Sequence, residues 1–228
     1  MATLGLIGSG LIGSTLARLA VAGGLDVVLS NSRGPETLSD LVAELGPHAK
    51  AGTPAEAAAA GDWVVVTVPL KAYKQVPQGP LAGKTVLDTN NYYADRDGTF
   101  PELEDDSTTS SELLQRHLPD AQVVKVFNNI FFKHLADLPR PAGAEDRTAL
   151  PIAGDDPAAK ARAAELLDVL GYDTVDTGTL AEGGRRFQPG TPAYALPFVE
   201  KPGPNFTEQP AAPASRTVIE AALAAHES

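Results

Sequence analysis

Short apolar runs alternate with amphipathic segments along the first four fifths of the chain. Seven of these runs predict β-strands, at residues 3–7, 26–30, 62–68, 85–88, 122–127, 149–153 and 174–176. Several of them consist of valine, leucine and isoleucine without polar alternation. Such a pattern is typical of strands that are buried on both faces of a parallel sheet.

The segments between the predicted strands carry start and stop signals for helices. Thr53 and Glu56 have the spacing of a capping box, and so have Thr109 and Glu112. Two further helices are expected over residues 35–45, which Gly46 ends, and over residues 156–170, which Gly171 ends. This alternation of strands and helices predicts an α/β protein with a doubly wound, mostly parallel sheet.

The alternation stops after about Glu182. Residues 183–214 are rich in proline and show no clear periodicity, and a last short helix is expected over residues 215–225. We therefore expect a domain over residues 1–182 and a C-terminal extension over residues 183–228. The extension should wrap either the domain or a partner subunit.

Composition narrows the class of protein. The 228 residues carry a formal net charge of −11, which disfavours a general nucleic-acid or acidic-membrane surface. The absence of cysteine excludes disulfides, thiolate metal sites and thiol nucleophiles, and no paired-histidine metal motif is present. The apolar runs are too short to span a bilayer, and no room for a signal peptide precedes Thr3. We expect a cytoplasmic protein without a metal and without a membrane or nucleic-acid partner.

A glycine-rich turn follows the first predicted strand. Residues 8–13 read GSGLIG, which fits the pattern G-x-G-x-x-G at the junction of a strand and a helix. In such a turn Gly8 permits the sharp bend, Gly10 lets the backbone approach a pyrophosphate, and Gly13 lets the helix pack on the sheet. The turn predicts a Rossmann domain that binds a dinucleotide.

The end of the second predicted strand indicates which dinucleotide is bound. An acid at about positions 28–31 would bind the ribose 2′-hydroxyl of NAD, but Asp26 stands at the opposite end of that strand. Asn31, Ser32 and Arg33 follow the strand instead. Short polar donors and a guanidinium suit a 2′-phosphate, so the sequence predicts NADP(H).

Three later strand ends are expected to face the same cleft. The first carries Val68-Pro69, where proline stiffens the chain beside the nicotinamide. The other two carry amides that could bind the nicotinamide carboxamide, the ribose or a substrate carbonyl, although asparagine is also a common turn residue. We expect Asn90 to contact the cofactor. The residues expected to act on the acceptor are Asn91, Tyr92 and Asn129.

No residue stands out as a catalytic acid. Among the histidines, only His134 follows a strand that ends at the expected cleft. Tyr92 is a candidate proton donor. Lys125 resembles the lysine of the lysine–asparagine pair in hydroxyacid dehydrogenases, but it lies inside a predicted strand rather than on a helix. A site of glycines, proline and amides suits direct hydride exchange between two redox cofactors, which needs stacking geometry more than a protein acid.

Five segments of the chain resemble one family. GLIGSGLIG, SNSRG, TVPL, VVKVFNNI and PIAGDD, within residues 3–182, are similar to the NADPH-dependent coenzyme F-420 reductases and to the N-terminal module of six-transmembrane ferric reductases. The resemblance implies NADP, hydride exchange at the nicotinamide C4 and a homodimer. It also implies site residues: Ser9, Gly10, Leu11 and Ile12 at the pyrophosphate, Ser32 and Arg33 at the 2′-phosphate, and Val68 and Pro69 at the nicotinamide.

Three functions follow from these observations. The first is an NADPH-dependent oxidoreductase whose acceptor is a deazaflavin (F420), a flavin or a small organic molecule. The second is a non-catalytic NADP(H)-binding redox sensor, for which the proline-rich extension would supply a partner surface. The third is an imine or ketone reductase, which would need a proton donor at the cleft.

Overall fold

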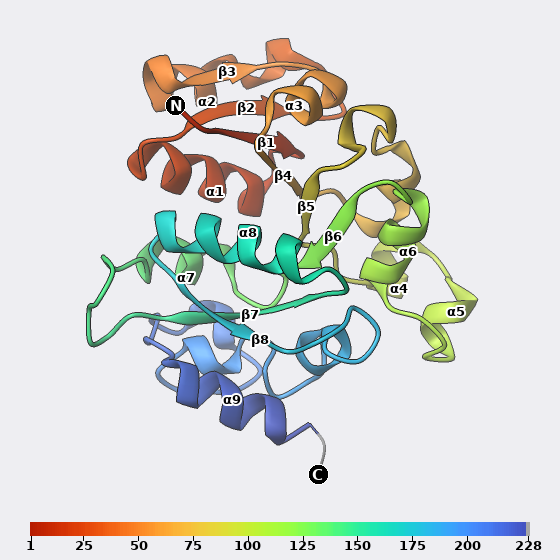
Figure 1. Ribbon diagram of the computed structural model, residues 1–228. Helices are drawn as coiled ribbons and strands as arrows, with labels where there is room; N and C mark the ends of the chain where they lie inside the picture. The colour runs from red at the N-terminus through yellow and green to blue at the C-terminus, as the bar shows by residue number, and fades with distance from the viewer. Residues whose placement is uncertain (227–228) are drawn as a thin grey trace.

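The computed structural model describes residues 1–226, and these form one sheet of eight strands in the order β3-β2-β1-β4-β5-β6-β7-β8 (Figure 1). All neighbouring strands are parallel except β6 and β7, which run antiparallel. The strands are β1 (Thr3–Ile7), β2 (Asp26–Ser30), β3 (Ala49–Ala51), β4 (Trp63–Val66), β5 (Thr85–Asp88), β6 (Gln122–Lys125), β7 (Ala149–Gly154) and β8 (Asp173–Asp176). The sheet confirms the predicted doubly wound α/β class.

Helices cover both faces of the sheet. They are α1 (Leu11–Ala22), α2 (Ser39–Leu45), α3 (Pro54–Ala60), α4 (Ala94–Asp97), α5 (Pro101–Glu104), α6 (Ser110–His117), α7 (Phe132–Asp137), α8 (Pro157–Val169) and α9 (Arg216–Ala224). Side chains of α1 and α8 pack into one hydrophobic cluster, whereas those of α3 and α6 pack into another. Across residues 1–226, no helix is both long and apolar enough to cross a membrane.

Burial on both faces explains why the apolar runs identified the strands. In β1, Leu4 and Leu6 belong to the cluster under α1 and α8, whereas Ile7 belongs to the cluster under α3 and α6. Successive side chains of a strand point to opposite faces, so a strand between two helical layers needs apolar residues at every position.

The structure departs from the sequence prediction in three details. The short edge strand β3 was not predicted, because its three residues include the exposed Lys50 and give no apolar run. Two predicted strands end early, at Val66 and Lys125, where the chain turns into the loops of the site. The helix expected over residues 35–45 is a 3-10 turn, Pro35–Leu38, followed by α2.

The C-terminal extension wraps its own domain. Phe187, Phe198 and Ile219 are fully buried, and they belong to the hydrophobic cluster that α1 and α8 form with the sheet. Helix α9 packs beside β7 and β8, at the end of the molecule that lies farthest from β3 (Figure 1). The extension is therefore part of the core rather than a solvated tail.

This packing predicts that the extension contributes to stability. Replacing Phe198 by alanine removes a fully buried ring, so Phe198→Ala should lower the free energy of unfolding by about 3–5 kcal/mol. Val218 of α9 is 44% exposed, so Val218→Ala should stay within about 0.5 kcal/mol of the parent protein. Urea denaturation measures both values. Equal stability of the two variants would show that the extension is only loosely attached.

Candidate active site

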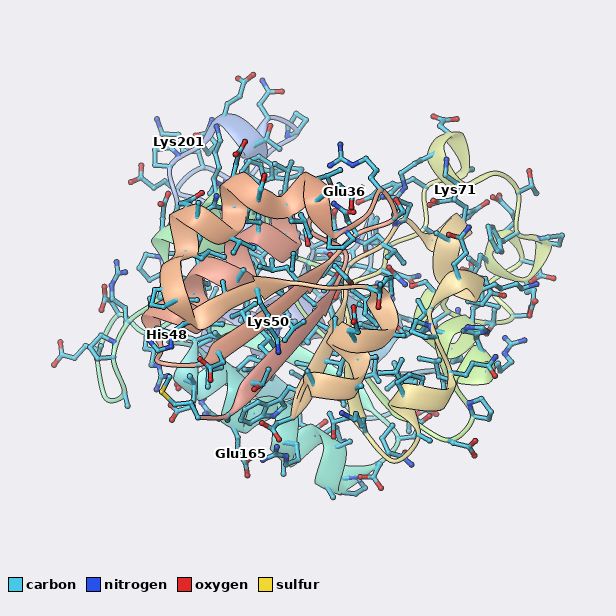
Figure 2. The ribbon with its side chains drawn as sticks, turned by 90° about the horizontal axis from the view of Figure 1, so that it is seen from above. Glu36, His48, Lys50, Lys71, Glu165 and Lys201 are labelled. Carbon is cyan, nitrogen blue, oxygen red and sulfur yellow. The ribbon has the colours of Figure 1, made fainter. Side chains whose placement is uncertain are left out.

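The site lies where the strand order reverses, at the carboxyl ends of β1 and β4. Ligands of open α/β sheets bind at such a switch point. The two strand ends are joined by a hydrogen bond from Thr67 Oγ1 to the carbonyl oxygen of Gly8, at 2.9 Å. Figure 2 marks the loops after β2 and β4 by Glu36 and Lys71, which both lie in the upper half of the view. Glu165 of α8 lies at the lower edge, away from these loops.

Each of the three glycines of the turn suits its position for a different physical reason. Gly8 has φ of 110°, and a Cβ there would lie 2.5 Å from the carbonyl oxygen of Thr67. A Cβ on Gly13 would lie 2.2 Å from the carbonyl oxygen of Gly8. A Cβ on Gly10 would meet no protein atom within 4 Å. The protein itself therefore requires Gly8 and Gly13, whereas Gly10 leaves open space in front of the backbone, where a pyrophosphate fits.

The start of α1 is open to a ligand. Side chains of Thr53, Thr109, Asp156 and Ser215 cap α3, α6, α8 and α9, but no side chain caps α1 at Gly10. The first N–H groups of a helix have no intrahelical partner, and they carry a positive partial charge. Leu11, in the first turn of α1, is 63% exposed. The uncapped turn thus fits a pyrophosphate, which would accept hydrogen bonds from the N–H groups of α1 as the cap side chains do in α3, α6, α8 and α9.

One cavity, of about 310 Å³, extends from this turn to the loop after β2. Ser32 and Arg33 line it, and both are exposed. Within residues 1–226, the Arg33 guanidinium has no hydrogen bond or ion pair. A free guanidinium beside a dinucleotide turn fits the 2′-phosphate of NADP.

Asn31 lines the same cavity, and its side chain also holds the loop after β2. Its Oδ1 accepts hydrogen bonds from the backbone N–H groups of Arg33 and Gly34, at 2.9 and 3.0 Å. Its Nδ2 donates to Thr37 Oγ1 at 2.8 Å. The expected contact of this side chain with the 2′-phosphate stays a prediction. The Asn31 side chain folds the loop that presents Ser32 and Arg33.

A second cavity, of about 410 Å³, lies on the other side of the turn. Gly10, Thr67, Val68 and Pro69 line both cavities, so the two are adjacent. Most of the other residues at the second cavity are polar or aromatic: Thr89, Asn90, Asn91, Tyr93, Arg96, Phe127, Asn128, Phe131, Phe132, Tyr194 and Phe206. The remaining four are aliphatic: Leu11, Ile12, Ile130 and Ala195.

Two buried amides of the second cavity have unpaired atoms. Asn90 is 2% exposed, and neither its Nδ2 nor its Oδ1 has a partner within the described residues. Asn128 is 5% exposed, and its Oδ1 is unpaired, while its Nδ2 donates to Asn91 Oδ1 at 3.1 Å and to the Phe187 carbonyl at 2.9 Å. Buried polar atoms without partners are costly. Water or a ligand in the cavity would complete the hydrogen bonds of these two amides.

Two tyrosines join the domain to the extension at this cavity. The hydroxyl groups of Tyr93 and Tyr194 lie 2.5 Å apart. Burial and the hydrogen bond with Tyr93 raise the pKa of Tyr194 above its usual range. Arg96 lies over the Tyr93 ring, with its guanidinium carbon 4.9 Å from the ring centroid. The extension thus supplies part of the cavity wall in the same chain.

Three residues considered for the acceptor site lie elsewhere. Asn129 is fully buried, and its Nδ2 donates to the Ala193 carbonyl at 2.9 Å. The Tyr92 hydroxyl donates to Glu104, which raises the pKa of Tyr92, and the ring lines a separate small pocket. His134 is buried and contacts the Gln209 carbonyl at 2.9 Å. The roles predicted for Asn129 and Tyr92 at the acceptor are therefore corrected by their positions.

The correction has a simple geometric cause. Tyr92 and Tyr93 are adjacent in extended chain, so their side chains point in opposite directions. Asn128 and Asn129 lie in the turn after β6, and that turn brings only Asn128 to the cavity. Asn128 lines the cavity while Asn129 turns away, and Tyr93 lines it while Tyr92 turns away. Asn91 does line the cavity, as expected. Tyr93 and Arg96 follow Asn90 and Asn91 closely in the chain, whereas only the folding of the extension brings Tyr194 to the same cavity.

The fold and the turn define the class of protein: this is a dinucleotide-binding α/β protein of the Rossmann type. A sequence model of the family described as NADP oxidoreductase, coenzyme F420-dependent, matches residues 3–92. The chain belongs to this family of NADP oxidoreductases, as its resemblance had predicted. A comparison with curated proteins gives no match.

Solved structures agree with this assignment. The hypothetical protein SMa0349 from Sinorhizobium meliloti is 32% identical, with a TM-score of 0.73, over 83% of this chain and 91% of its own. A protein of Arthrobacter sp. FB24, assigned as an F420-dependent NADP reductase, is 29% identical, with a TM-score of 0.68, over 82% and 90% of the two chains. An imine reductase from Myxococcus stipitatus is 21% identical, with a TM-score of 0.54, over 80% and 56%, and it shares the fold.

The free guanidinium generates a direct prediction. A hydrogen bond to a charged group contributes about 1.5–3 kcal/mol, so Arg33→Ala should weaken NADPH binding by roughly 10- to 150-fold. NADH affinity should change little, because NADH has no 2′-phosphate. Titration calorimetry with both cofactors measures the two effects.

Arg18→Ala is the matched control for this experiment. Arg18 forms an exposed ion pair with Glu44 at 2.6 Å, on the same helix that begins at the glycine turn. Its loss should leave both affinities unchanged. Equal losses for NADPH and NADH in Arg33→Ala would contradict the assignment of Arg33 to the 2′-phosphate.

Proposed function

We propose that this protein is an NADPH-dependent oxidoreductase that exchanges a hydride with a second redox ring, a deazaflavin such as F420 or a flavin. One observation carries the proposal. The cavity beside the glycine turn continues into a chamber walled by aromatic rings and by amides with unpaired atoms. Among the described residues that line it, none is an aspartate, glutamate, histidine, lysine or cysteine.

The bound cofactor would follow the two cavities. Its pyrophosphate would lie at the uncapped start of α1, and its 2′-phosphate at Ser32 and Arg33. The nicotinamide would lie beside Val68 and Pro69, which line both cavities. The free Asn90 amide offers a donor and an acceptor, which matches the carboxamide of a nicotinamide.

The acceptor would lie in the rest of the chamber. Phe131, Phe132 and Tyr194 provide faces and edges for a planar ring, because aromatic groups favour offset-stacked or edge-to-face contacts. The unpaired Asn128 Oδ1 can accept a hydrogen bond from a ring N–H. Hydride transfer requires the reacting atoms about 3–3.5 Å apart, and the walls of the chamber would hold the two rings in that geometry.

The chemistry of the walls supports transfer between rings. NADPH, when bound, supplies a hydride, which is two electrons and one proton, to a carbon of a deazaflavin or to a nitrogen of a flavin. A reduced deazaflavin or flavin takes any further proton at a nitrogen, without a fixed acid in the protein. A chamber without carboxyl or imidazole groups is adequate for this reaction.

The tyrosine pair supports a second candidate, the reduction of a ketone or an imine. The hydrogen bond between the two hydroxyl groups uses one of their two protons. The other proton is available to the developing alkoxide or amine, so either phenol could act as the proton donor. A third candidate, the non-catalytic sensor, would bind NADPH and leave every acceptor unreduced.

Removing both hydroxyls distinguishes the first two candidates. In Tyr93→Phe/Tyr194→Phe, oxidation of NADPH by a deazaflavin should keep most of its rate, because no phenol takes part. Reduction of a ketone or an imine should fall by roughly 100-fold or more, since general acid catalysis contributes at least that much. Loss of NADPH absorbance with a panel of acceptors measures both reactions.

The same panel decides among all three candidates. Turnover of a ketone or imine alone, lost in the double variant, would favour the small-molecule reductase. NADPH binding without turnover of any acceptor would favour the sensor. The homodimer implied by the family resemblance stays a prediction, which light scattering of the parent protein tests.

A further inference from the structure

Two buried charged residues, Asp88 and Lys125, lie directly behind the second cavity without lining it. Both are fully buried, and they are the last residues of β5 and β6. They are paired in the register of these two strands. None of the functions considered above uses them.

The contacts of both side chains converge on the backbone of Asn90. Asp88 Oδ1 accepts a hydrogen bond from the Asn90 N–H at 2.9 Å. Lys125 Nζ donates to the Asn90 carbonyl oxygen at 3.1 Å. Side chains therefore hold both backbone polar groups of Asn90, at the point where the chain has left the sheet.

Two serines at the start of α6 complete this network. Ser110 Oγ also donates to the Asn90 carbonyl, at 3.2 Å, and Ser111 Oγ donates to Asp88 Oδ2 at 2.6 Å. Lys125 Nζ lies 3.2 Å from each serine hydroxyl. On its other side, Gly184 of the extension covers the lysine stem, since a Cβ on Gly184 would lie 3.4 Å from Lys125 Cδ.

We infer that Lys125 is a positioning residue: together with Asp88 it fixes the backbone of Asn90 and so aims the free Asn90 amide at the nicotinamide. This inference rests on the proposed function, because it assigns the Asn90 amide to the cofactor. Lys125 itself touches neither the cofactor nor the acceptor.

A purely structural role explains this arrangement less well. Burying two charges costs several kcal/mol per ion, and an apolar pair of similar volume is often as stable or more stable. Burial lowers the pKa of Lys125 to about 8, and the Asp88 carboxylate opposes that shift. Burial likewise raises the pKa of Asp88. What the pair provides, and an apolar pair would not, is an acceptor for the N–H of Asn90 and a donor to its carbonyl oxygen.

The test compares ligands with and without a nicotinamide. NADPH and 2′-phospho-ADP-ribose share the phosphates, but only NADPH carries the carboxamide. The ratio of their affinities, from titration calorimetry, reports the contact with Asn90 and needs no acceptor. The central variant is Asp88→Asn/Lys125→Met, which removes both charges together and leaves no single buried charge.

Asn90→Ala should lower this ratio by roughly 2- to 12-fold, the range for a neutral hydrogen bond. The charge-free variant should lower it by a similar factor, while its affinity for 2′-phospho-ADP-ribose stays unchanged. Adding Asn90→Ala to the charge-free variant should cause no further loss, because Lys125 acts through Asn90.

Lys160→Met is the matched control. Lys160 pairs with Asp176 at 2.9 Å beside α8, and it has no contact with Asn90. Its removal should leave the ratio unchanged. Ser110→Ala removes only one hydroxyl that donates to Asn90, so it should give part of the same loss, and it serves as the second test if the charge-free variant does not fold.

Several outcomes would overturn the inference. The first is an unchanged affinity ratio in Asn90→Ala. The second is an unchanged ratio in the charge-free variant or, if that variant does not fold, in Ser110→Ala. The third is a combined variant whose loss in the ratio equals the product of the two separate losses. A lower unfolding temperature with an unchanged ratio would assign Lys125 to stability alone. If the ratio behaves as expected but no acceptor is reduced, the hydride-transfer proposal fails and the positioning role stands.

Discussion

The uncapped start of α1 is the feature on which the rest of the site depends. Its free N–H groups lie at the carboxyl ends of β1 and β4, and both cavities open from that point. A helix end with unsatisfied donors is stable there only if water or an anion supplies the acceptors. This constraint makes the start of α1 the expected place of a pyrophosphate. With a pyrophosphate there, the cavity at Arg33 would hold the 2′-phosphate and the other cavity would hold the nicotinamide.

The C-terminal extension makes the second cavity a chamber rather than an open groove. It is anchored by Phe187 and Phe198 in the main hydrophobic cluster, and from there it supplies Tyr194 and Phe206 to the wall. An extension that packs into the core in this way gives the wall a defined position. The same segment thus contributes both to the hydrophobic core and to the wall of the second cavity.

The polar groups around the chamber are divided between two tasks. Some side chains hold the backbone, as Asn31 does in the loop after β2 and as Asp88 and Lys125 do behind Asn90. Others keep unpaired atoms at the cavities, as Arg33 and Asn90 do. The first group bears the cost of burial so that the second group can stay in place for a ligand.

The sequence by itself determined the elements with strong local signals. Apolar runs predicted seven of the eight strands, capping boxes predicted α3 and α6, and the turn at Gly8 with Arg33 predicted the cofactor. Local patterns could not decide direction and pairing, such as the antiparallel β7, because these depend on long-range contacts. They also could not decide which member of Asn128-Asn129 or Tyr92-Tyr93 faces the cavity, since the turn after β6 and the surrounding packing make that selection. The tertiary structure alone placed Tyr194 opposite Tyr93, because residues a hundred positions apart meet only when the extension folds back onto the sheet.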